Sequence, residues 1–148
     1  MLFDNFSTGD QEQVKKIGRV KKYAYGDQVI KENDSGDSLF VVLSGRLEVK
    51  KGIDEGRNKK LKDLEAGEFF GEMSFFDRLA RSADVVAAGE CELMELSMEE
   101  VDKLAADNPA LGAKLYKNLA RELTIRLRAN NDELRRTIIW AIEGWTYA

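Results

Sequence analysis

The segment from Phe69 to Val86, which reads FFGEMSFFDRLARSADVV, decides how the rest of this chain is interpreted. It places the pair Gly71-Glu72 before a short apolar turn and ends with an arginine that is followed by a serine. A glycine lets backbone N–H groups approach a ligand closely, and a helix that begins there directs free N–H groups at an anion. Arg81 offers a planar fork of donors to phosphate oxygens, with the Ser82 hydroxyl beside it. Because a carboxylate such as Glu72 suits a sugar hydroxyl, the segment favours a ligand with one phosphate and one ribose.

These residues resemble the phosphate-binding cassette of cyclic nucleotide-binding domains. The resemblance is carried by Phe70-Gly71-Glu72 and Arg81-Ser82-Ala83, extends upstream through residues 25–45, and covers roughly residues 10–130. One departure is Ala80, where members of the family often have a proline before the arginine, and it removes no ligand contact. The resemblance implies a mainly β fold, an eight-stranded β-roll flanked by a short N-terminal helix and a long C-terminal helix.

The resemblance also implies the ligand and the roles of the site residues. The ligand would be cyclic AMP or cyclic GMP, with no other cofactor; Arg81 would anchor its phosphate and Glu72 would accept its ribose 2′-hydroxyl. The other candidate ligand-binding residues are Phe70, Gly71, Met73, Ser74, Ser82 and Ala83. For the Met73 side chain, packing in the core is the favoured interpretation. A hydroxyl directly after the arginine is compatible with either base, so Ser82 leaves cyclic AMP and cyclic GMP both open.

Arg126 and Arg128, further along the chain, could reach the purine as a lid. For both, a solvated helix face is the favoured interpretation. Residues 114–136 carry more basic than acidic side chains, but no aromatic residues alternate with them as in surfaces that stack nucleic-acid bases. We therefore expect no nucleic-acid partner.

Composition excludes several classes of function. The 148 residues are 43% hydrophobic and 34% charged with a net charge of −4, which is typical of one globular domain. The absence of histidine argues against Ser-His catalysis and against most zinc and iron sites, so we expect neither an enzyme nor a metal centre. A single cysteine, no signal peptide and no long apolar run predict a cytoplasmic protein without a membrane segment.

Local patterns define the expected elements. Residues 10–17 have the spacing of a short helix, and many short β-forming runs follow at turn spacings typical of a sandwich or barrel. The polar segment 52–60 is predicted to be an exposed hairpin loop. We expect residues 1–108 to hold the N-terminal helix and the β-roll, with residues 109–148 forming a long helix and an apolar tail of the same domain.

The predicted C-terminal helix runs without proline from Pro109 to about Ile142, and its apolar residues recur at helical spacing. A helix of about 33 residues spans roughly 50 Å, which exceeds the roughly 30 Å diameter expected for a domain of this size. It must overhang its own domain, so we predict a homodimer packed along it, with Asn130 or Asn131 fixing the register. The alternative is a break near these asparagines that folds the helix back.

The apolar and aromatic tail, residues 137–147, is open to three interpretations: it closes over the ligand, extends the dimer contact or docks a separate partner. Taken together, the sequence predicts a regulatory sensor that binds a cyclic purine nucleotide and moves its C-terminal helix in response. The alternative is a dimerisation scaffold of the same fold that does not bind nucleotide and acts through a protein partner. Whether the chain stands alone or belongs to a longer regulator stays open.

Overall fold

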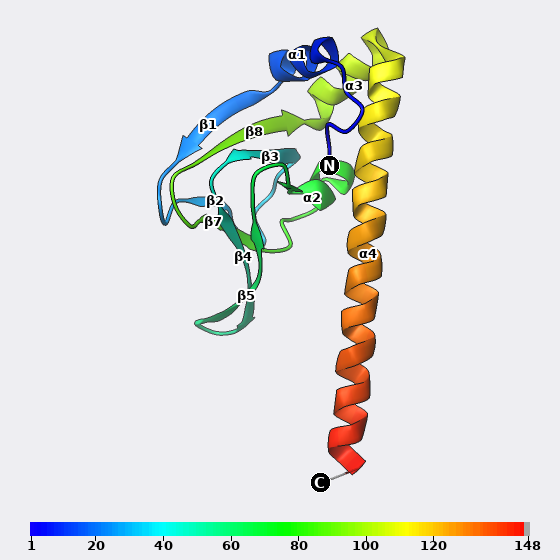
Figure 1. The fold of residues 1–148 in the computed structure, drawn as a ribbon. Helices are drawn as coiled ribbons and strands as arrows, with labels where there is room; N and C mark the ends of the chain where they lie inside the picture. Colours follow the sequence, from blue (N-terminus) through cyan, green and yellow to red (C-terminus); the bar gives the residue numbers. More distant parts are fainter. Residues whose placement is uncertain (147–148) are drawn as a thin grey trace.

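The computed structural model describes residues 1–146, with the side chains of residues 145 and 146 excepted, so Tyr147 of the expected tail lies outside the described residues (Figure 1). In chain order the elements are α1 (Thr8–Ile17), β1 (Arg19–Tyr23), β2 (Gln28–Ile30), β3 (Ser38–Ser44), β4 (Leu47–Asp54), β5 (Arg57–Leu64), β6 (Phe69–Phe70), α2 (Glu72–Asp77), β7 (Asp84–Ala87), β8 (Cys91–Ser97), α3 (Met98–Asp107) and α4 (Pro109–Thr146).

The strands of the described chain form two four-stranded antiparallel sheets. One sheet has the order β1-β8-β3-β6 and the other the order β2-β7-β4-β5. The helices α1, α3 and α4 lie together at one side of these sheets, and α4 continues well past them (Figure 1). The predicted β-roll with a short first helix and a long last helix is therefore confirmed. No helix among residues 1–146 is long and apolar enough to span a bilayer.

Strand β3 explains why the core has two parts. Side chains alternate between the two faces of a strand, so Leu39 and Val41 pack with the helices while Phe40 and Val42 pack between the sheets. All four are buried. A strand that is covered on both faces has a continuous apolar sequence, and residues 39–43 are such a run.

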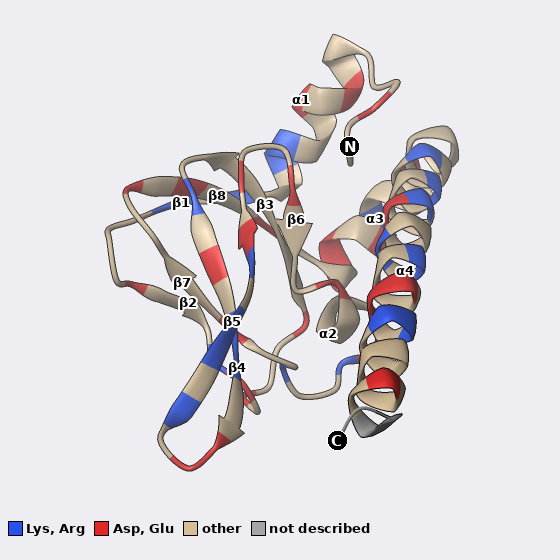
Figure 2. Ribbon diagram, turned by 60° about the horizontal axis from the view of Figure 1, so that its bottom comes forward, with Lys and Arg blue, Asp and Glu red and all other residues tan. Residues whose placement is uncertain are grey.

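The hairpin β4–β5 differs from its prediction. Segment 52–60 was expected to be a loop, but its two arms continue the strands, with Gly52 opposite Asn58 and only Glu55 and Gly56 between them. The residues are exposed, as expected. Its polar composition does not exclude a strand here, because an edge hairpin that projects into solvent has no apolar face to reveal it. Basic residues gather on β5, close to acidic ones at the turn (Figure 2).

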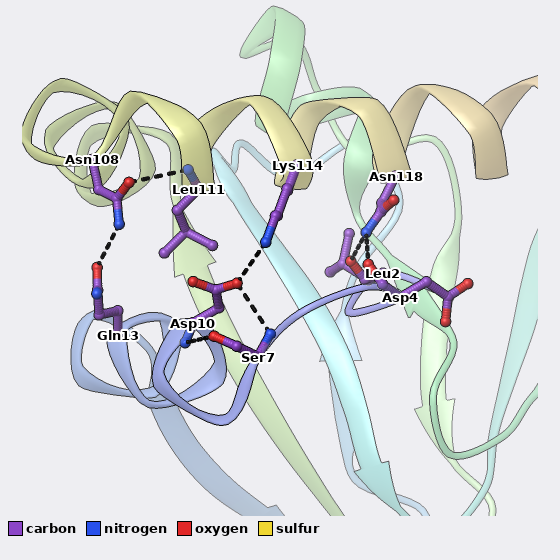
Figure 3. Close-up of polar contacts among 9 residues, drawn as sticks. All are labelled: Leu2, Asp4, Ser7, Asp10, Gln13, Asn108, Leu111, Lys114 and Asn118. Carbon is purple, nitrogen blue, oxygen red and sulfur yellow. Dashed lines mark hydrogen bonds and ion pairs between the residues drawn. The ribbon is translucent and has the colours of Figure 1, made fainter.

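Helix α1 and the N-terminal segment are fixed to α4 by polar contacts (Figure 3). The helix begins two residues before its predicted start, because Ser7 and Asp10 form a reciprocal capping box. Asp10 also accepts a bond from Lys114 Nζ at 2.9 Å. Asn118 is buried and donates to the backbone carbonyls of Leu2 and Asp4, both at 2.8 Å.

Helix α4 is continuous over 38 residues, so the alternative of a break near Asn130 is wrong. Its first half is anchored in the core by Leu111, Leu115 and Leu119. Residues 131–144 are all exposed, and the far half of the helix extends away from the β-roll (Figure 1). Leu134, for example, has 58% of its surface exposed.

Candidate functional site

Arg81 lies at the centre of the candidate site, in the turn that precedes β7. Its side chain is only 8% exposed. Its Nη1 donates to the carbonyl oxygens of Ser38 at 2.9 Å and Gly71 at 3.1 Å. Burial lowers its pKa, and the nearby Asp37 carboxylate partly opposes this shift. An arginine remains charged in any protein environment, so the site holds a buried cation in a fixed orientation.

Neighbouring backbone segments pack tightly against Arg81 and leave no room for a side chain at two glycines. Its N–H donates to Asp34 O at 2.8 Å, and its carbonyl accepts from Asn33 N at 2.9 Å. A Cβ atom on Gly36 would come within 2.6 Å of Arg81 Cζ, and one on Gly71 would lie 2.9 Å from both Arg81 Nη1 and Ser38 O. Because such distances are too short for a real Cβ, both glycines are required for this position of the guanidinium.

Glu72 is the first residue of α2, directly after Gly71, whose φ is +81°. Its half-buried carboxylate lies 3.4 Å from Arg126 Nη1. Arg126 also donates from Nη2 to Phe69 O at 2.6 Å, and its guanidinium lies 4.1 Å from the Phe69 ring centroid. The interpretation of Arg126 as part of a solvated face is therefore wrong. Arg128, in contrast, is exposed.

These groups surround one cavity of about 90 Å³. Its lining consists of Ile30, Val49, Lys62, Phe70, Gly71, Glu72, Met73, Ser74, Arg81, Ser82, Ala83, Val85 and Arg126. The structure thus brings together all eight predicted cassette residues and adds Arg126, while Arg128 is not among the lining residues. Met73 corrects a prediction: its side chain is 56% exposed at the cavity and is not packed in the core. Helix α2 has only six residues, and the ones it buries are Ser74 and Phe75.

Sequence reasoning missed four lining residues that form one row across a sheet. Ile30 pairs with Val85, Val85 with Val49, and Val49 with Lys62. Residues that pair directly across strands share a face of the sheet, so this row forms one wall of the cavity. Single-sequence patterns carry no register between strands that are far apart in the chain. The alternation of apolar and polar residues at the start of β4 was the only available signal.

Lys62 is exposed over much of its length, but its amino group is partly screened from water. This desolvation lowers its pKa, and the positive charge of Arg126 lowers it further, whereas Glu72 and Glu68 oppose the shift. The cavity therefore has one cation at Arg81 and two more at Lys62 and Arg126, and the Glu72 carboxylate lies beside Arg126. Among residues 1–146, no group of three or more His, Cys, Asp or Glu side chains is arranged to hold a metal ion.

Comparison with known proteins decides the family. The family model described as the cyclic nucleotide-binding domain matches residues 20–108. The chain belongs to this family. Two of its relatives are the cyclic GMP-binding protein C of Dictyostelium discoideum, 36% identical over 74% of the chain, and the cyclic AMP receptor protein of Thermus thermophilus, 35% identical over 82% of the chain. A solved cyclic nucleotide-binding domain from Methylobacillus flagellatus is 31% identical, with a TM-score of 0.82 over 90% of this chain and 75% of its own.

The cyclic nucleotide-binding domain described here spans only part of these relatives. It corresponds to 4% of the Dictyostelium protein and 56% of the Thermus protein. Other relatives have names that designate regulators, such as the cAMP-dependent protein kinase regulatory subunit of Blastocladiella emersonii, which is 29% identical over 99% of this chain and 36% of its own length. The names of these relatives thus designate regulators and proteins that bind or respond to cyclic AMP or cyclic GMP.

Proposed function

We propose that this chain is a non-catalytic regulatory module that binds cyclic AMP or cyclic GMP in the cavity around Arg81 and transmits binding through α4. The observation that carries the proposal is the buried Arg81 guanidinium, held at a cavity that also exposes a carboxylate. A ligand with one phosphate and a neighbouring hydroxyl satisfies both groups. Names of the relatives include binders of each nucleotide, so they support the class without choosing the base.

Phosphate binding would use the donors of Arg81 that do not hold its position. Both of its bonds to backbone carbonyls use Nη1, which leaves Nε and Nη2 for phosphate oxygens. Hydrogen bonds of this kind, with a charged donor, contribute about 1.5–3 kcal/mol each. Ser82, Ala83 and the start of α2 would supply the remaining phosphate contacts, since the first N–H groups of a helix have no partner within it.

The relay would begin at Arg126. Its ion pair with Glu72 occupies the carboxylate to which the ribose 2′-hydroxyl would bind, and the cavity of about 90 Å³ is smaller than the roughly 300 Å³ or more of pockets that enclose small ligands. A nucleotide would therefore have to displace Arg126 from Glu72 as it enters. Because Arg126 belongs to α4, its displacement would shift the helix, and the shift is limited by the difference in the ligand's affinity for the two arrangements.

The exposed half of α4 would form a dimer with a second copy of the chain. Leu127, Asn131, Leu134, Ile138 and Ala141 recur at intervals of four and three residues, which is the spacing of a coiled-coil seam. Leu127, Leu134 and Ile138 are exposed in the single chain. An asparagine within the seam would select one register at some cost in stability. In this proposal residues 1–108 and 109–148 act as one domain, and an effector protein receives the signal.

Calorimetric titration with cyclic AMP and cyclic GMP tests the proposal. The protein would first be unfolded and refolded to remove any nucleotide bound during purification. We expect micromolar binding of at least one nucleotide, and about a hundredfold loss in Arg81→Ala, which corresponds to roughly 3 kcal/mol for two lost charge-assisted bonds. Glu72→Gln, which keeps the shape of the side chain, should weaken binding less. Arg128→Ala is the matched control on α4 and should bind like the unaltered chain.

The exposed seam favours one second candidate function, a dimerisation scaffold whose cavity does not bind nucleotide. Absence of binding heat for both nucleotides, with a folded protein verified by circular dichroism, would refute the sensor and leave the scaffold as the better interpretation. Binding that survives unchanged in Arg81→Ala would also refute the proposed site, because a phosphate held elsewhere would not need that guanidinium.

A further inference from the structure

The proposed function leaves the end of the cavity opposite to Arg81 without a role. The position of this end follows from the row of paired residues across the sheet, Ile30, Val85, Val49 and Lys62. Arg81 to Ala83 lead directly into β7, which carries Val85, and a Cβ on Gly71 would lie 3.4 Å from Ile30 Cδ1. The phosphate end is therefore over β2 and β7. Lys62 lies two strands further, which is about 10 Å at the usual strand spacing.

This separation matches a nucleotide that lies along the row. With its phosphate at Arg81 and its ribose at Glu72, the purine would lie over Val49 and reach towards Lys62. The apolar Val49 and Val85 side chains suit the face of a purine ring. The edge of the ring would contact the residues that line the cavity at its β5 end. The functional groups of the residues at that end thus determine which base is accepted.

Only donors are available among the lining residues at that end. Lysine and arginine donate hydrogen bonds and accept none, and Lys62 and Arg126 both line the cavity there. Glu72 is assigned to the ribose, and Glu68, whose carboxylate lies near Lys62, is not among the residues that line this cavity. Guanine presents two acceptors, O6 and N7, on the edge where adenine presents the acceptor N7 and the donor N6. Adenine would therefore place a donor against two cations.

We propose that Lys62 reads the O6/N7 edge of the base, so that this site prefers cyclic GMP to cyclic AMP. The inference rests on the proposed nucleotide-binding function and extends it to a specificity-determining residue. Lys62 is better placed for this role than Arg126, which is bonded to Phe69 O and, in the proposed relay, would move with α4 as the nucleotide enters. Its partly desolvated amino group also gains more from a new acceptor than an amino group in water does.

Cyclic IMP separates this mechanism from a reading by Ser82. Its base carries O6 and N7 as guanine does but has no 2-amino group. If Lys62 reads the base, cyclic IMP should bind nearly as tightly as cyclic GMP, and both about tenfold more tightly than cyclic AMP. If the Ser82 hydroxyl reads the 2-amino group instead, cyclic IMP should bind as weakly as cyclic AMP, and the proposal would be overturned.

The variants test the residue directly by the same calorimetric titration of nucleotide-free protein. In Lys62→Met the preference for cyclic GMP should fall to about twofold or less, with cyclic AMP binding retained, and Lys62→Glu should reverse it because a carboxylate accepts from N6. Lys59→Met is the matched control, since Lys59 lies on the same strand, is exposed and is not among the lining residues. All three changes are on an exposed edge strand, so thermal unfolding should show folded proteins.

Failure of this inference is distinguishable from failure of the proposed function. Binding of cyclic AMP equal to or tighter than that of cyclic GMP, or a preference that Lys62→Met leaves unchanged, would overturn the reading by Lys62 while the site itself stands. No binding of any of the three nucleotides would overturn both.

Discussion

Substitution of Gly71 by alanine tests how the site is held together. The change has two costs, the strain of a positive φ and the contact of the new Cβ with Arg81, and Gly26 and Gly36 each show one of these costs alone. Gly71 combines a φ of +81° with a Cβ position that is 2.9 Å from Arg81 Nη1 and Ser38 O. Gly26 has a similar φ of +85° but nothing within 4 Å of its Cβ position. Gly36 lacks a positive φ, but its Cβ would lie 2.6 Å from Arg81 Cζ.

The expected losses in the free energy of unfolding follow from these differences. Gly26→Ala should cost about 1 kcal/mol, the usual penalty for an L-residue in the left-handed region. Gly71→Ala should cost about 3 kcal/mol, since the same penalty is joined by about 2 kcal/mol for the bond or bonds that a displaced Arg81 loses. Gly36→Ala should cost about 2 kcal/mol, without the backbone penalty, and should weaken nucleotide binding about as strongly as Gly71→Ala does.

Urea unfolding at one fixed protein concentration, followed by circular dichroism, measures all three variants on the same scale. Titration with cyclic GMP then shows which variants keep the site. If Gly71→Ala were no more destabilising than Gly26→Ala, the two carbonyl contacts of Arg81 would contribute nothing. If Gly36→Ala bound nucleotide normally, the position of the guanidinium would not matter for binding, and our account of the site would be refuted.

Three further predictions concern α4 and its contacts. Leu134→Asp should convert the proposed dimer into monomers in light-scattering measurements, weakening it by about 3 kcal/mol or more, whereas Arg136→Ala on another face should not; a dimer that persists would exclude this seam. Asn118→Ala should cost about 2 kcal/mol in urea unfolding because it removes the donor from two backbone carbonyls, in one buried and one partly buried bond, and a loss below about 0.5 kcal/mol would contradict this. The bond from Lys114 holds the pKa of Asp10 below its ordinary 3.8, so its stabilising contribution is present above that pH and is lost as the pH falls through the folded-state pKa. Asp10→Asn should therefore reduce the acid sensitivity of unfolding below about pH 4, and an unchanged profile would show that this contact has no effect.

Much of the cassette could be predicted from sequence because its chemistry is local. Gly71, Glu72 and Arg81 are close together in the chain, and their residue types alone indicate what they can bind. The long helix was also predictable, since the spacing of Leu111, Leu115 and Leu119 continues without proline. In both cases the information lies within one element or one turn, where period and residue type are sufficient.

The contacts between distant segments could not be predicted. Lys62 looks like any exposed lysine of a basic hairpin until the register of β5 against β4 places it at the cavity. Arg126 is one of several basic residues on α4, and only the position of the helix beside Phe69 distinguishes it from Arg128. Sequence periodicity gives the face of a helix or strand but not the element that it meets.

The unbroken course of α4 has a mechanical consequence. Twenty residues separate Arg126 from the last described residue of the helix, Thr146, which is about 30 Å at 1.5 Å per residue. A stiff rod of this length, pivoting at the cavity, is a lever: a tilt of about 10° would carry its end roughly 5 Å. A displacement too small to rearrange the β-roll could thus be amplified at the far end, where Trp140 has 76% of its surface exposed.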